Sequence, residues 1–194
     1  MKKITFILTF ILSFNTMAED VWQCGENCTA TLDENGILRV SGTGEMYSYD
    51  LQTRFHTPWL SSQDRIKTVI VEDGITKIGD DAFFGCNFIE KIELAKSVQY
   101  VGNDAFDENQ RLQSVTMYDS TLWDTQGNLN DADWATPSIN IYCYGDLQKC
   151  EQNFSHTSGM KSKLSLNYKG KRIYTIDEAN RVAGAKNRVS IRYR

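Results

Sequence analysis

The cysteines are the residues of this 194-residue chain best suited to chemistry, and there are 5 of them. Cys24 and Cys28 form one close pair, Cys143 and Cys150 form another, and Cys86 is left over. Such residues serve as disulfide partners, zinc ligands or a nucleophile. Zinc is disfavoured because the spacings do not fit its usual patterns and the chain has only 2 histidines. We therefore expect two local disulfides, Cys24–Cys28 and Cys143–Cys150, if the chain reaches an oxidising compartment.

The N-terminus has the pattern of a leader that would carry the chain there. Lys2 and Lys3 precede an almost unbroken apolar run over 4–14, and small residues then favour cleavage after Ala18. An uncleaved membrane anchor is the alternative, but the run is short for a bilayer. We expect a signal peptide at 1–18 and a mature chain, exported to the periplasm, the cell surface or the medium, that has no transmembrane span. Loss of the two lysines takes the formal charge from -4 to -6, with 19 basic and 25 acidic residues.

Few other residues suggest catalysis. Asp80 and Asp81 are adjacent carboxylates, but Asn103 and Asp104 occupy the same positions of a repeat, which favours turn and cap residues over an acid–base pair. The histidines, His56 and His156, have no apparent partner. Mild acidity argues against a nucleic-acid surface. We expect no enzyme, no cofactor and no metal.

Between residues 66 and 117 the sequence repeats at an interval of 23. At eight positions of the first copy, the residue 23 places later is of the same kind: aliphatic, phenylalanine, alanine or glycine. These positions are Ile66, Val69, Val71, Ile75, Ile78, Gly79, Ala82 and Phe83. A third copy begins with Leu112, Val115 and Met117 and then loses the pattern. An interval of this length is typical of leucine-rich repeat solenoids, whose units bury their apolar faces by stacking.

Each unit predicts a short strand followed by a turn. Val69 and Val71 alternate with polar neighbours, which indicates one inward face. Ile75 and Ile78 return to the core at helical spacing, Gly79 allows a tight bend, and the residues from Asp80 to Phe83 would form a short helical or 3₁₀ turn. The expected outward residues of three strands, a face about three coils wide, are Thr68, Ile70, Glu72, Lys91, Glu93, Ser114, Thr116 and Tyr118.

The segment Gly74-Ile-Thr-Lys-Ile-Gly-Asp-Asp-Ala-Phe-Phe-Gly-Cys86 closely resembles the unit of the BspA-type leucine-rich repeat family. The second copy departs from that unit, since Asn109 stands where the cysteine would fall. The resemblance implies that Cys86 is a buried repeat residue rather than a nucleophile. It also implies a bacterial protein that binds proteins or mediates adhesion.

The fold class expected is strand-rich α+β, a short solenoid with a cap at each end. An N-terminal cap at 19–64 contains a hairpin of 29–32 with 37–41, and it resembles the cap of BspA-like proteins. Trp22 and Trp59 would cover that end of the core, with a sugar-binding platform as the alternative. The solenoid runs over 65–154 and ends in a strand at 139–144 and a short helix. A linker at 155–162 leads to a basic β-β-α-β segment at 163–194.

Three functions compete at this stage. The first is an exported binding module that contacts a protein or surface polymer through the sheet face. The second is a structural or assembly component of the cell envelope that docks through the basic C-terminal segment. The third, an envelope hydrolase, lacks any convergent catalytic set in the sequence.

Overall fold

A computed structural model describes residues 19–50, 55–123, 139–146, 148–150, 152, 164–168 and 171–175. Nine strands form the larger sheet, in the spatial order β1 (Asp20–Gly25), β2 (Cys28–Leu32), β3 (Ile37–Gly42), β5 (Thr68–Val71), β7 (Lys91–Leu94), β9 (Ser114–Tyr118), β11 (Ile139–Tyr144), β12 (Leu164–Tyr168) and β13 (Lys171–Thr175). Four short strands form a second sheet, in the order β10 (Leu122–Trp123), β8 (Tyr100–Val101), β6 (Ile75–Ile78) and β4 (Gly44–Glu45). A single 3₁₀ helix, η1, is described at Leu60–Arg65.

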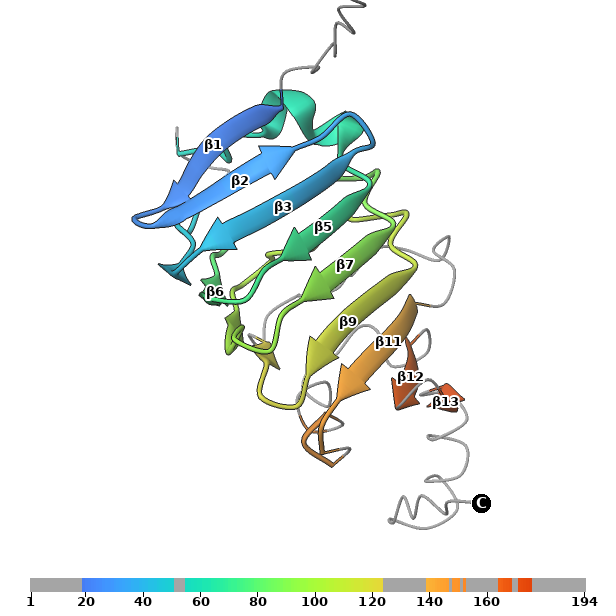
Figure 1. Ribbon diagram of the computed structural model, residues 1–194. Helices are drawn as coiled ribbons and strands as arrows, with labels where there is room; N and C mark the ends of the chain where they lie inside the picture. Colours follow the sequence, from blue (N-terminus) through green and yellow to red (C-terminus); the bar gives the residue numbers. More distant parts are fainter. Residues whose placement is uncertain are drawn as a thin grey trace, which may run out of the picture.

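The strands of the larger sheet lie side by side, and each repeat coil adds one strand to the sheet (Figure 1). The first three are antiparallel, those from β3 to β12 are parallel, and β13 is again antiparallel. Thr68 pairs with Lys91, and Lys91 pairs with Ser114, so partners on neighbouring coils are 23 residues apart here. The prediction of a strand-rich repeat fold is therefore confirmed.

The core lies between the two sheets and continues from coil to coil. Val69, Ile92 and Val115 are fully buried on successive strands of the larger sheet. A column of aromatic rings runs beside them, in which Trp59, Phe83, Phe106 and Trp123 follow one another at centroid distances of 5.3, 5.0 and 6.0 Å. Contact between equivalent side chains of adjacent coils is what buries the apolar face of each unit.

The prediction of a short helical turn inside the repeat is wrong, whereas the predicted burial of the residues before it is observed. Ile75 and Ile78 are both buried, at the two ends of strand β6. Residues 80–85 form turns but no helix, because the N–H groups of Asp81, Phe83 and Gly85 donate to carbonyls of the next coil instead of to their own turn. Phe83 N–H, for example, donates to the Ala105 carbonyl at 2.8 Å.

The reason for glycine at position 79 also differs from the expected tight bend. A Cβ atom at Gly79 would lie 1.9 Å from the Tyr47 carbonyl oxygen, far inside van der Waals contact. The glycine is therefore required by the close approach of the preceding coil, which lets the backbones of consecutive units touch.

The N-terminal cap contains the predicted hairpin, as β2 and β3, and the unpredicted edge strand β1. Trp59 is fully buried, and its ring centroid lies 6.3 Å from that of Trp22 in an edge-on contact. Both tryptophans thus pack at the end of the core, which argues against a sugar-binding platform.

Part of the C-terminal segment joins the larger sheet, since β12 pairs in parallel with β11 and β13 pairs with β12. The predicted signal peptide, the linker at 155–162, and the helix and last strand expected after residue 175 lie outside the described residues. Among the described residues, no helix has the length and apolar character needed to cross a bilayer.

Candidate functional site

Seven of the eight predicted surface residues lie on the three repeat strands, at positions that alternate with the buried ones, and Glu72 directly follows β5. In β5, β7 and β9 the core residues are fully or almost fully buried, whereas the residues between them are half-buried or exposed. The register joins Ile70 to Glu93 and Glu93 to Thr116, so these side chains form a row across the sheet. The strands therefore bring the predicted residues together on one outer face.

This outer face is wider than the three coils expected from the sequence. Arg39 of β3 pairs with Ile70, and Tyr142 of β11 pairs with Thr116, so the same row continues in both directions. Beyond Arg39 the row passes through Thr31 and Val21 of the cap. Nine strands at about 4.8 Å spacing give the larger sheet a width of about 38 Å. The cap and the closing strands thus enlarge the surface that the repeats begin.

Charges near the middle of the outer face largely balance. Arg39 Nη1 lies 4.0 Å from Glu72 Oε1, and Lys91 forms an ion pair with Glu93 on its own strand. All four side chains are more than one-third exposed, so these pairs contribute little to stability. Their effect is to leave this part of the face polar and close to neutral.

Tyrosine rings gather at the C-terminal end of the same face. Tyr118 and Tyr144 are paired across β9 and β11, with ring centroids 5.6 Å apart and 36° between the planes. Tyr144 is 43% exposed, and Tyr142, two residues earlier on β11, points to the same side. The sequence prediction included Tyr118 but missed Tyr142 and Tyr144, although the alternating pattern of 139–144 carried the signal.

The cysteine predictions have opposite outcomes. Cys143 and Cys150 are joined by a disulfide, with their Cα atoms 6.2 Å apart, and this bond ties the helical residues 148–150 to β11. Cys24 and Cys28 are instead buried thiols, so the predicted bond between them is wrong. The Cys28 Sγ points toward the next segment, where it donates to the carbonyls of Thr43 at 3.5 Å and Glu45 at 3.3 Å. Burial raises the pKa of Cys24 to about 12 and also raises the pKa of Cys28.

The side chains of the repeat considered above as candidate catalytic groups serve the packing of the coils instead. Cys86 is only 2% exposed, and burial raises the pKa of its thiol to about 12, which keeps it from acting as a thiolate nucleophile. Asp80 Oδ1 accepts a hydrogen bond from the Asn103 backbone N–H at 2.9 Å, so this carboxylate joins one coil to the next. Within the described ranges, no group of three or more His, Cys, Asp or Glu side chains is placed to hold a metal ion.

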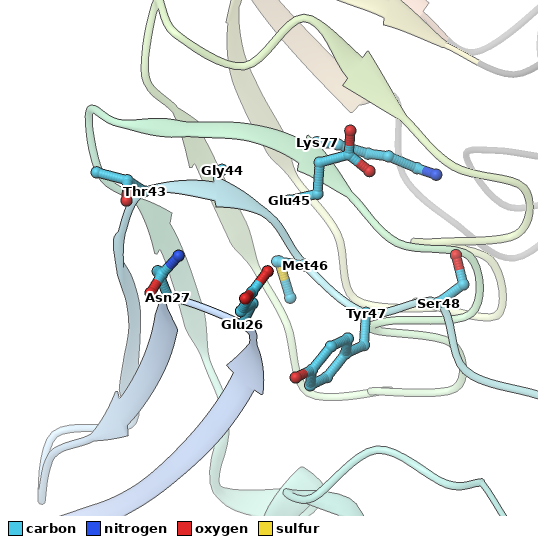
Figure 2. Close-up of a pocket in the computed structure, with 9 residues that line it drawn as sticks. All are labelled: Glu26, Asn27, Thr43, Gly44, Glu45, Met46, Tyr47, Ser48 and Lys77. Atoms are coloured by element: carbon cyan, nitrogen blue, oxygen red, sulfur yellow. The ribbon is translucent and has the colours of Figure 1, made fainter.

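A pocket of about 430 Å³ lies beneath the β1–β2 turn (Figure 2). Its walls come from the turn itself, from the segment around β4 and from β6, and they are lined by Glu26, Asn27, Thr43, Gly44, Glu45, Met46, Tyr47, Ser48 and Lys77. No sequence pattern predicted this pocket, because its walls are far apart along the chain. It is separate from the eight predicted residues of the outer face.

The repeat coils match a known protein-family model. Residues 60–128 match the family model described as "BspA type Leucine rich repeat region (6 copies)". This stretch is therefore similar to the BspA-type leucine-rich repeat region. The match covers β5 to β10, the coils whose strands and aromatic column form the core described above. No curated protein gives a significant match.

Two solved structures resemble the chain, and both are of leucine-rich proteins from bacteria. A leucine-rich repeat protein from Eubacterium ventriosum is 21% identical, with a TM-score of 0.49 over 81% of this chain and 46% of that one. A leucine rich cell surface protein from Faecalibacterium prausnitzii is 11% identical, with a TM-score of 0.31 over 66% of this chain and 45% of that one. The chain therefore spans less than half the length of either protein.

Proposed function

We propose that this chain is an exported protein-binding module that uses the outer face of the larger sheet to bind or adhere to a partner protein. The observation that carries the proposal is the continuity of that face. Rows of partly exposed side chains cross the strands from the cap to β11 without a break in register from β3 onward. A repeat solenoid offers such a surface as an extended binding site.

The chemistry of the face suits a protein partner. Tyrosine is enriched among the residues that dominate protein interfaces, and Tyr118, Tyr142 and Tyr144 lie together at one end. The balanced pairs Arg39–Glu72 and Lys91–Glu93 provide polar groups around them. We assign the tyrosines the larger share of the binding energy and the charged residues the selection of partner.

An exported location supports the same proposal. The Cys143–Cys150 disulfide fits an oxidising compartment, and residues 60–128 match the model of the BspA-type repeat family. We place the mature chain in the periplasm, on the cell surface or in the medium.

A pull-down with two matched variants tests the proposal. The baits are residues 19–194 with the wild-type sequence, a face variant with Glu72→Lys, Lys91→Glu and Glu93→Lys, and a loop variant with Glu90→Lys, Lys96→Glu and Glu108→Lys. Both variants change three exposed or half-exposed charges and shift the net charge equally. A second face variant, Tyr118→Ala with Tyr144→Ala, tests the tyrosines separately.

A partner from host or bacterial extracts that binds the wild type and the loop variant, but neither face variant, is the expected result. A partner retained by both face variants would contradict the assignment of the outer face. If no extract yields a partner for any bait, the protein-binding function itself fails.

A further inference from the structure

The pocket beneath the β1–β2 turn is held together by backbone contacts. Gly25 forms an isolated antiparallel bridge with Met46, and Tyr47 N–H donates to the Cys24 carbonyl at 2.8 Å. These contacts hold the turn, which carries Glu26, against the segment that carries Glu45. A Cβ at Gly25 would lie 2.3 Å from the Glu45 carbonyl oxygen, which shows how closely the two backbones approach. The walls of the pocket therefore do not depend on flexible side chains.

The third wall is fixed in the same way. Met46 N–H donates to the Lys77 carbonyl of β6 at 3.0 Å. The Lys77 ammonium group lies 5.6 Å from the centroid of the Tyr100 ring, a residue outside the pocket lining. The one basic residue of the lining is thus partnered by an aromatic ring beyond the pocket.

The two carboxylates of the pocket are exposed and form no ion pair within the part of the chain that the structure describes. Glu26 and Glu45 come from segments nineteen residues apart, yet both line the same cavity. The described ion pairs involve other residues, namely Arg39–Glu72, Arg65–Asp20 and Lys91–Glu93. Two like charges beside one cavity attract a cation, which would relieve their repulsion.

The remaining lining selects among cations. Met46 is 3% exposed and gives the pocket an apolar floor, while the 41%-exposed ring of Tyr47 stands at its edge (Figure 2). A hard inorganic cation such as Ca²⁺ or Mg²⁺ takes oxygen ligands and gains nothing from the Met46 thioether. An arginine side chain does, because its stem covers apolar surface and its planar guanidinium both stacks on aromatic rings and bonds carboxylates in pairs.

We propose that this pocket receives an arginine side chain of a protein partner, with Met46 and Tyr47 against the stem and Glu26 and Glu45 against the guanidinium. The net charge of -4 favours the approach of such a basic segment. The pocket involves none of the outer-face residues, so this inference stands independently of the function assigned to the larger sheet.

A methionine methyl group inside the pocket provides a direct test. Residues 19–194 are labelled with ¹³C at the methionine methyls and titrated with N-acetyl-arginine amide. The Met46 resonance is expected to shift and saturate, while that of Met117, fully buried in β9, stays in place. N-acetyl-citrulline amide, a neutral molecule of nearly the same shape, is expected to leave Met46 unchanged.

Variants then assign the binding to the carboxylates. Glu26→Gln with Glu45→Gln is expected to raise the dissociation constant at least about tenfold, the loss of roughly one charged hydrogen-bonded contact. Glu34→Gln is the matched control, since Glu34 is an exposed glutamate of the β2–β3 turn, at the other end of the hairpin. An unchanged Met117 resonance shows that each variant keeps the fold.

Three results would overturn the proposal: no shift of Met46, citrulline binding as tight as arginine binding, or an unaltered constant in the double variant. N-acetyl-lysine amide is expected to bind several-fold more weakly than the arginine compound. Equal binding of the two would overturn the assignment of a guanidinium. Because no outer-face residue is altered, these results are distinguishable from failure of the pull-down.

Discussion

The indole of Trp59 stacks on the ring of Phe83, with 5.3 Å between their centroids and 14° between their planes. The indole Nε1–H also donates to the Ala82 carbonyl at 3.1 Å. The cap tryptophan is therefore the first ring of the column that continues through Phe83 and Phe106. This contact couples the cap to the repeat, so we expect the two to unfold together.

Removal of one ring from the middle of the aromatic column tests how much the column contributes to the free energy of unfolding. Phe106→Ala is expected to lower the free energy of unfolding by about 3–5 kcal/mol, because it leaves a cavity between Phe83 and Trp123. Phe88→Ala is the control, since Phe88 is 37% exposed and contacts the Arg111 guanidinium at 4.3 Å, an interaction of about 0.5–1 kcal/mol. Urea unfolding followed by tryptophan fluorescence measures both. Equal losses at the two positions would contradict the column as a stabilising element.

The sequence predicted the repeat strands because equivalent apolar positions recur, and stacked coils require the same residue type at the same place. It missed β4, β8 and β10, since strands of two residues are too short to show alternation. The spacing of Ile75 and Ile78 correctly predicted their burial but did not reveal β6, because both ends of this four-residue strand are buried.

The binding surfaces were predictable to different degrees. Alternation alone assigns Thr68 or Lys91 to the outer face, and the same rule applied to 139–144 would have added Tyr142 and Tyr144. The pocket depends on the bridge between Gly25 and Met46, a long-range contact that no local pattern encodes. The direction of the Cys28 thiol likewise depends on β4, so spacing along the chain predicted the wrong bond.

The thiol content of the chain follows directly from this geometry. With one disulfide among 5 cysteines, alkylation of the unfolded, unreduced mature protein is expected to modify three thiols, namely Cys24, Cys28 and Cys86. In the folded protein at pH 8 these thiols should react far more slowly, because they are buried and the pKa values of Cys24 and Cys86 are raised to about 12. Mass spectrometry after iodoacetamide treatment counts the modified residues. A single modified thiol would mean that Cys24 and Cys28 are bonded.

The Cys143–Cys150 disulfide closes a short loop, which limits its contribution. For a loop of this length, the chain-entropy model gives a stabilisation of about 2.5 kcal/mol, so replacing both cysteines by alanine should lower the free energy of unfolding by about that amount. Cys86→Ala, a buried cysteine outside the disulfide, controls for the loss of sulfur packing. Urea unfolding of the three proteins measures the difference. A loss no larger than that of Cys86→Ala would show that the bond does not stabilise the fold.

Strands β12 and β13 protect an edge, which predicts how the chain responds to truncation. β12 pairs with β11 over five residues, from the Ile139–Leu164 pair to the Cys143–Tyr168 pair. A chain ending at residue 163 loses these backbone hydrogen bonds, each worth about 0.5–1.5 kcal/mol net, and exposes β11 as an open edge. We expect a lower midpoint of urea unfolding and association that grows with concentration, measured by light scattering after gel filtration.

A chain ending at residue 175 keeps both strands and serves as the matched control. It should unfold and elute like the mature protein, because the ladder from β11 to β13 is intact. If the two truncations behave alike, the pairing of β12 with β11 does not stabilise the sheet. If the two chains behave differently, loss of β12 alters the solenoid itself. A docking role for the C-terminal segment must then be tested on the chain that ends at residue 175.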